Sequence, residues 1–107
     1  MEAEYQGEVR QRSAVLSDEA WAGLKARGVM EGRSASELCQ FLLEKYLALE
    51  EKPVYAMPEG LQARQRSIYV SDVTWAEVKA TAVRQRRTGS HVLEQLIRGY
   101  LGLELER

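Results

Sequence analysis

Side chains able to carry out covalent or metal chemistry are few in this chain of 107 residues. It contains one cysteine, Cys39, and one histidine, His91, too few for a Cys/His metal site or an internal disulfide. The sequence also has no glycine-rich phosphate loop and no nucleophile with a plausible base nearby. We therefore expect a protein that is not an enzyme and that uses no cofactor or metal. Cys39 is expected to be a buried apolar thiol and His91 a solvated side chain.

Basic residues are unevenly distributed along the chain. The densest basic run is Arg84-Gln-Arg-Arg87, which is interpreted either as a solvated helix end or as a clamp for phosphate. The net charge of −1 and the pI of about 5.9 are unusual for a nucleic-acid-binding domain. However, residues 64–104 carry seven basic and four acidic residues, a net +3, whereas residues 10–50 carry six of each. The other six acidic residues lie in the linker and near the two ends of the chain.

An internal repeat organises the sequence. Residues 10–50 align with residues 64–104 at an offset of 54 without a gap, and 18 of the 41 aligned positions are identical. Residues 51–63 lie between the copies and contain Pro53, Pro58 and Gly60, so they are predicted to be a linker. Extended at roughly 3.3 Å per residue, this linker reaches about 40 Å, which lets the second copy pack back on the first.

Each copy is predicted to form a short strand followed by two helices. Residues 12–17 are rich in small or branched side chains, and Ile68 and Val70 alternate with their neighbours in the second copy, so both segments are predicted to be strands. The residues expected to face inward are Ala14, Leu16, Ile68 and Val70. Apolar residues at helical spacing follow, and the first-helix stripes are Trp21, Leu24, Gly28, Val29 and, in the second copy, Trp75, Val78, Ala82, Val83. A unit of about 40 residues buries too little apolar area alone, so each copy needs a partner. We expect a mostly α fold with a short β ribbon: a tandem pseudo-dimer with a two-stranded antiparallel ribbon and four helices.

The order and spacing of these elements resemble a known family. In the first copy the matching segments are residues 11–17, residues 21–32, and residues 33–37 together with the helix that they begin. In the second copy they are residues 65–71, residues 75–86, and residues 88–90 together with the helix that they begin. Together they resemble the ribbon-helix-helix superfamily of bacterial and phage repressors, the MetJ, Arc and CopG type, over about four-fifths of the chain. This resemblance implies sequence-specific binding of double-stranded DNA, with paired strands in the major groove, and a role as a transcriptional regulator.

The resemblance also implies which residues contact DNA. Side chains on the outer face of the ribbon would read bases: Gln11, Ser13, Val15, Gln65, Ser67 and Tyr69. Residues beside the strands and at the start of each second helix would contact phosphates: Arg10, Arg12, Arg33, Ser34, Ser36, Arg64, Arg66, Arg87, Thr88 and Ser90. If the strands pair, the four strand arginines are expected to cluster on the ribbon. Tyr69 departs from the small polar residues expected at such a position.

Several alternatives stay open at this level. A slip of one residue in the first strand would turn Ser13 and Val15 inward and change the base-reading set. The ribbon could form within one chain or between two chains that exchange copies, and two pseudo-dimers could associate as a homodimer. The alternative function is a protein-interaction module that kept the fold and lost DNA binding. The sequence predicts no membrane span and no secretory signal, so the expected location is the cytoplasm.

Overall fold

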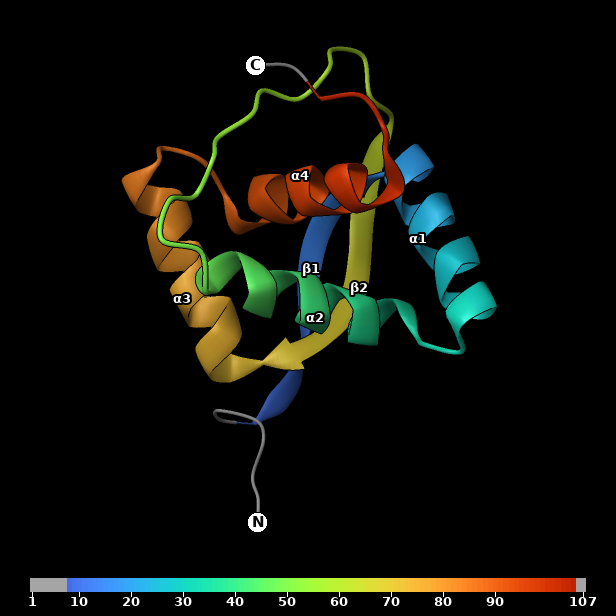
Figure 1. The fold of residues 1–107 in the computed structure, drawn as a ribbon, viewed down its shortest axis with the longest axis horizontal. Coiled ribbons are helices and arrows are strands. Elements are labelled where there is room, and N and C mark those ends of the chain that lie inside the picture. Colours follow the sequence, from blue (N-terminus) through green and yellow to red (C-terminus); the bar gives the residue numbers. More distant parts are fainter. Residues whose placement is uncertain (1–7, 106–107) are drawn as a thin grey trace.

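The computed structural model describes residues 8–105, which fold as two βαα units in tandem (Figure 1). The first unit consists of β1 (Val9–Ser17), α1 (Asp18–Glu31) and α2 (Ala35–Leu47). The second unit consists of β2 (Ala63–Ser71), α3 (Asp72–Arg84) and α4 (Gly89–Leu101). The predicted fold, four helices with a two-stranded antiparallel ribbon, is therefore confirmed.

The ribbon forms within the single chain. Strands β1 and β2 pair antiparallel with Ser13 opposite Ser67, so the two copies are related by a pseudo-twofold axis through this pair. The inward residues Ala14, Leu16, Ile68 and Val70 are all fully buried. The predicted strand register is thus confirmed, because a slip of one residue would have exposed these apolar side chains.

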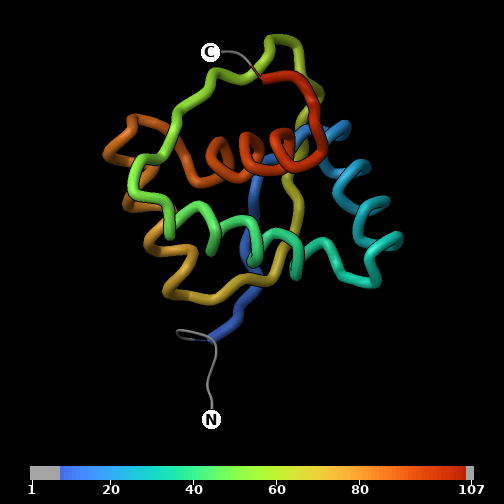
Figure 2. The backbone as a smooth tube through the Cα atoms, viewed as in Figure 1, coloured from blue at the N-terminus to red at the C-terminus, as the bar shows by residue number. Residues whose placement is uncertain are grey.

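Helices α2 and α4 lie across one face of the ribbon, and α1 and α3 lie at opposite sides of the molecule (Figures 1 and 2). Helix α2 of the first unit packs on β2, and helix α4 of the second unit packs on β1. The two second helices also contact each other. The core is therefore shared between the units, which is the reason that neither copy needs a second chain to cover its apolar surface.

A hydroxyl residue caps the N-terminus of each of the four helices. Ser17, Ser34, Ser71 and Thr88 each accept a hydrogen bond from the backbone N–H three residues further on. Such N-caps satisfy one of the unpaired donors of a first helical turn. The strands therefore turn into α1 and α3 without an intervening loop, which fixes the directions of these helices relative to the ribbon.

Two apolar residues do not lie where the helical stripes predicted. Val29 and Val83, at equivalent positions of α1 and α3, are 83% and 72% exposed. Leu24 and Gly28 are buried, and the next residue is turned by about 100° around the helix axis, which directs Val29 to solvent. The inclusion of Val29 and Val83 in the buried stripes was therefore wrong. No helix within residues 8–105 is long and apolar enough to cross a membrane.

Candidate nucleic-acid interface

The outer face of the ribbon carries all six predicted base-reading side chains. In register they form three cross-strand pairs, and every one of the six is exposed: Gln11 with Tyr69, Ser13 with Ser67, and Val15 with Gln65. The alternation of a pleated strand places them on one side and the buried residues on the other. This face is a row of polar groups that also carries two apolar side chains, Tyr69 and Val15, which are 54% and 52% exposed.

The outer face is nearly symmetric. Gln11 and Gln65 are equivalent in the repeat, as are Ser13 and Ser67, so the pseudo-twofold axis relates identical groups. The exception is Val15, whose equivalent is Tyr69. Symmetry is also broken by a hydrogen bond in which the Gln11 amide donates to the Ser67 hydroxyl, at 2.8 Å. A surface of this kind presents two related but unequal halves.

The four strand arginines do not form one cluster, contrary to expectation. Antiparallel pairing separates them into Arg10 with Arg12 at one end of the ribbon and Arg64 with Arg66 at the other. Arg10 and Arg12 form ion pairs with Asp72 at the start of α3. Arg64 and Arg66 form ion pairs with Asp18 at the start of α1. These arginines share the helix-facing register of the buried residues, which brings their guanidinium groups to the first acidic residue of the adjoining helix.

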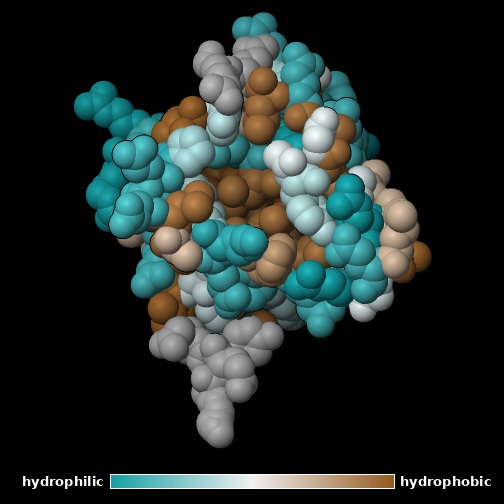
Figure 3. Space-filling model, in the orientation of Figure 1, coloured by the Kyte–Doolittle hydropathy of each residue, from teal (hydrophilic) through white to brown (hydrophobic). Residues whose placement is uncertain are grey.

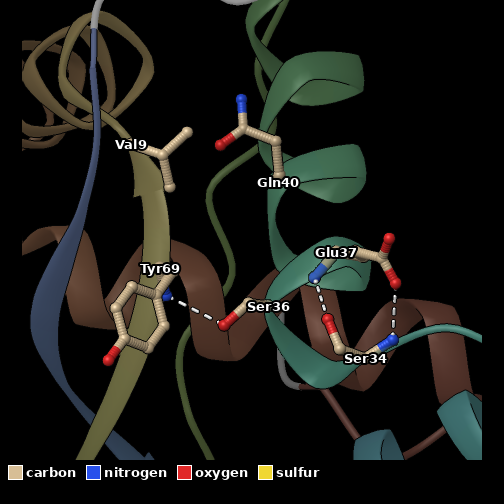
Figure 4. A pocket seen from close by; sticks show the side chains of 6 residues that line it. All are labelled: Val9, Ser34, Ser36, Glu37, Gln40 and Tyr69. Atoms are coloured by element: carbon tan, nitrogen blue, oxygen red, sulfur yellow. Dashed lines mark hydrogen bonds between the residues drawn. The ribbon is translucent and has the colours of Figure 1, made fainter.

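The starts of α2 and α4 lie beside the two outer edges of the ribbon. The Ser36 hydroxyl of α2 accepts a hydrogen bond from Tyr69 N–H in β2, at 2.8 Å (Figure 4). At the equivalent place the Ser90 hydroxyl of α4 accepts from Val15 N–H in β1, at 2.9 Å. Each serine therefore satisfies an edge donor of the ribbon and fixes a helix N-terminus next to the base-reading face. Helix N-termini favour anions because their N–H groups and dipole point outward.

A hollow of about 550 Å³ lies between the start of α2 and the ribbon edge (Figure 4). Ser34 and Ser36 line it together with Glu37. The Glu37 carboxylate accepts a hydrogen bond from Ser34 N–H at 2.7 Å, and the Ser34 hydroxyl accepts from Glu37 N–H at 3.0 Å, which completes a capping box. Arg33 lies with its guanidinium 4.9 Å from the centre of the Phe41 ring. A negative charge therefore stands at this helix start.

The equivalent hollow at the start of α4 is smaller, about 210 Å³. Met57 and Leu61 of the linker line it, alongside Thr88, Ser90 and His91. His91 occupies the position that Glu37 holds in the first unit, so this helix start carries no carboxylate at that place. The linker thus covers part of the second helix start and leaves the first one open.

Arg87 connects the linker to the second helices. Its guanidinium donates hydrogen bonds to Gln95, to the Tyr46 hydroxyl and to the Pro53 carbonyl. These bonds direct the side chain inward from the start of α4, away from the direction expected of a phosphate ligand. The neighbouring Arg84 and Arg86 remain exposed.

The environment of His91 favours the neutral form of its imidazole. Burial lowers the pKa of His91 below its ordinary value of 6.5, the positive charge of Arg87 lowers it further, and Glu94 partly opposes this. The Nε2 atom is buried and has no hydrogen-bond partner within residues 8–105. His91 is therefore partly buried, and not the solvated side chain that was expected. Cys39 is buried as expected, and burial raises the pKa of its thiol to about 12.

The sequence reasoning missed a buried polar group beneath each ribbon edge. In the second unit the Glu94 carboxylate accepts from Ser17 N–H and from the Ser17 hydroxyl, at 2.9 and 2.6 Å, and pairs with Arg98 at 3.2 Å. In the first unit Gln40 accepts from Ser71 N–H at 2.9 Å. The spacing of Glu94 and Arg98, four residues apart on one helix, was the available signal for an ion pair.

The six base-reading residues and the hydroxyls at the starts of α2 and α4 thus lie around one surface that combines the ribbon face with two helix starts. Arg87, Arg12 and Arg66 instead bind groups of the fold itself. Comparison with protein-family models, with curated proteins and with solved structures finds no match. The interpretation of this surface therefore depends on its geometry and chemistry.

Proposed function

We propose that this protein binds double-stranded DNA sequence-specifically, as a tandem member of the ribbon-helix-helix class, and acts as a transcriptional regulator. The observation that carries the proposal is the outer ribbon face, where three cross-strand pairs are exposed while the apolar residues of the opposite face, Ala14, Leu16, Ile68 and Val70, are fully buried. A two-stranded ribbon fits the major groove of B-DNA, and there alternate side chains reach base edges.

The side-chain chemistry of this face supports base reading. The amides of Gln11 and Gln65 can form bidentate pairs with adenine, and the hydroxyls of Ser13 and Ser67 can donate or accept. Val15 offers a methyl contact to thymine, and Tyr69 offers a ring and a hydroxyl. The equivalent glutamines and serines would read related bases in two halves of one site, and Val15 and Tyr69 would distinguish these halves.

Phosphate binding is assigned to the helix starts and to the exposed arginines at the ribbon ends. Ser34, Ser36, Thr88 and Ser90 carry hydroxyls beside helical N–H groups, which suit a phosphate oxygen. Arg10 and Arg64 have 60% and 75% of their side-chain surface exposed. Arg12 and Arg66 are more enclosed and would serve by holding Asp72 and Asp18.

The proposal is tested by capture of random or genomic DNA fragments, first with the native protein and then with Gln11, Ser13, Gln65 and Ser67 changed to Ala. The native protein should enrich one motif, and the four-alanine variant should lose this enrichment while remaining folded. The matched control replaces Val29 and Val83 by Ser, because both are exposed on α1 and α3 and neither is among the residues assigned to DNA contact. The control variant should enrich the same motif as the native protein.

The alternative function is a protein-interaction module on the same fold. It is favoured by the ion pairs that engage Arg12 and Arg66 and by the carboxylate of Glu37 at the α2 start. Specific DNA binding should weaken steeply with added salt because phosphate contacts release counterions. Absence of motif enrichment by folded native protein, with negligible retention on DNA at about 0.1 M salt, would refute the DNA-binding proposal and support the alternative.

A further inference from the structure

A second hollow lies on the face of α2 and α4 that is turned away from the ribbon. Its volume is about 520 Å³, and Figure 3 shows apolar side chains gathered in a depression between these helices. Phe41 and Leu42 of α2 and Leu96 and Tyr100 of α4 line its walls. A cavity of this size with apolar and aromatic walls is typical of small-molecule sites.

The hollow exists because the two halves differ at equivalent positions. Lys45 of α2 corresponds to Gly99 of α4, so one wall carries a long side chain and the other carries none. Phe41 corresponds to Gln95, which replaces an aromatic ring with a hydrogen-bonding amide. A Cβ atom placed on Gly99 would have Leu105 as its nearest neighbour, 4.0 Å away, so there is room for a larger residue.

The linker closes one side of the hollow through Pro53 and Tyr55. The Gln95 amide holds this part of the linker, because its nitrogen donates to the Pro53 carbonyl at 2.9 Å and its oxygen accepts from Tyr55 N–H at 3.2 Å. Arg87 also donates to the Pro53 carbonyl. Hydrogen bonds from Gln95 and Arg87 therefore hold the linker wall of the hollow in place.

Among residues 8–105, Lys45 is the one charged residue that lines this hollow. Its ammonium lies 5.3 Å from the centre of the Phe41 ring, and it forms no ion pair with any residue between 8 and 105. Apolar walls that include three aromatic rings, with one unpaired cation at the side, complement an apolar molecule that ends in a single negative charge.

We propose that the hollow between α2 and α4 binds a small aromatic carboxylate, with its ring between Phe41 and Tyr100 and its carboxylate beside the Lys45 ammonium. This site is separate from the ribbon face, so the inference does not depend on DNA binding. Helices α2 and α4 stand between the two surfaces, which allows both to be occupied at the same time (Figure 1).

The test uses phenylbutyrate and its neutral counterpart phenylbutyramide, titrated into the protein while backbone amide NMR signals are followed. Saturable shifts should centre on residues around the hollow, and the carboxylate should bind about fivefold more tightly than the amide, as one charge pair screened by water would give. Lys45→Met should remove this difference, because it keeps the aliphatic stem and deletes the charge. Lys25→Met, a lysine change on α1, is the matched control and should preserve it.

Gly99→Leu supplies the second test, because its side chain should fill the hollow. This variant should abolish binding of both compounds while its unfolding transition remains cooperative. Equal affinity for the amide and the carboxylate in the native protein would overturn the assigned chemistry. An absence of saturable shifts would also overturn the proposal. One such case is a dimer of the native protein in sedimentation that Gly99→Leu disrupts, since a second copy would then occupy the hollow.

Discussion

The beginnings of α2 and α4 occupy equivalent places at the two edges of the ribbon, and their surroundings differ. At the start of α2, Glu37 closes a capping box and the hollow beside it is open. At the start of α4, His91 replaces the glutamate and the linker residues Met57 and Leu61 enter the hollow. The shared parts are a hydroxyl cap and a serine that satisfies an edge N–H of the ribbon.

This difference shows what fusion of two copies in one chain permits. In a symmetric homodimer every substitution appears twice, once on each side of the axis. In a tandem chain one half can change alone. The two helix starts can therefore keep the same backbone arrangement while they differ in charge and in how far the linker covers them. The same divergence appears in the buried polar groups, where the first unit uses neutral Gln40 and the second uses the Glu94–Arg98 ion pair.

The largest expected effect concerns this buried pair. Arg98 is 2% exposed and contacts both Glu94 and Glu19, at 3.2 and 3.1 Å. Arg98→Met should lower the free energy of unfolding by about 3–5 kcal/mol, because it leaves the Glu94 carboxylate buried without its cation. Gln40→Met in the other half should cost about 1–3 kcal/mol, the penalty for leaving Ser71 N–H unsatisfied. Urea unfolding followed by circular dichroism measures both.

A double variant separates charge from packing in this comparison. Glu94→Gln added to Arg98→Met gives the second unit an uncharged amide like that of the first, and most of the lost stability should return. If the double variant is no more stable than Arg98→Met alone, the loss comes from the volume and apolar contacts of Arg98, and the two halves do not differ in the way described.

The second prediction addresses the ribbon face and depends on the proposed DNA binding. Tyr69→Val gives both halves the same outward residues, so the preferred DNA element should become palindromic. Each base pair that Tyr69 reads should then lose its preference, which is worth about 1–3 kcal/mol per base pair. The measurement is motif enrichment from random DNA, with Val15→Tyr as the matched variant that also makes the face symmetric. Retention of an asymmetric motif by both variants would contradict the assigned role of Tyr69.

The elements and the inward face of the ribbon were predictable because they depend on local pattern. The internal repeat, the period of two in the strands and the hydroxyl caps predict the order of elements, and the burial of Ala14, Leu16, Ile68 and Val70 confirms the register. Pairing within one chain was not decided by the sequence, since the reach of the linker permitted both arrangements. In the structure β1 pairs with β2 of the same chain, so the ribbon forms within one chain.

The features that escaped prediction depend on contacts between residues far apart in the sequence. Arg12 meets Asp72 and Arg66 meets Asp18 only because the strands pair antiparallel and each leads directly into a helix. The entry of Met57 into the hollow at α4 depends on the path of the linker across the folded units. Residue type and spacing alone carry no record of such contacts, so the expected arginine cluster and the solvated His91 were wrong.

A third, smaller effect is expected at the turn that follows α3. Arg86 adopts a left-handed backbone conformation with φ of 61°, and its equivalent in the first unit is Gly32 with φ of 68°. Because this conformation costs a side-chain-bearing residue about 1 kcal/mol, Arg86→Gly should stabilise the protein by about that amount. Gly32→Ala should destabilise it to a similar extent, and thermal unfolding measures both. If Arg86→Gly and Gly32→Ala do not change the melting temperature in opposite directions, the left-handed backbone conformation does not carry the expected cost.

The smallest expected effect is a pH dependence that belongs to the second unit alone. The pKa of His91 is lower in the folded protein than its ordinary value of 6.5, so the folded state favours the neutral imidazole. The contribution of His91 to the free energy of unfolding is therefore complete above pH 6.5 and falls as the pH drops from 6.5 towards the folded-state pKa. His91 is the one histidine of the chain, so its ring signal in proton NMR reports the titration directly. If a DNA phosphate binds at the start of α4, the negative charge should raise the pKa of His91, and DNA should bind more tightly as pH falls. An unchanged His91 titration in the DNA complex would place the phosphate contact elsewhere and leave the open α2 start as the edge that meets the backbone.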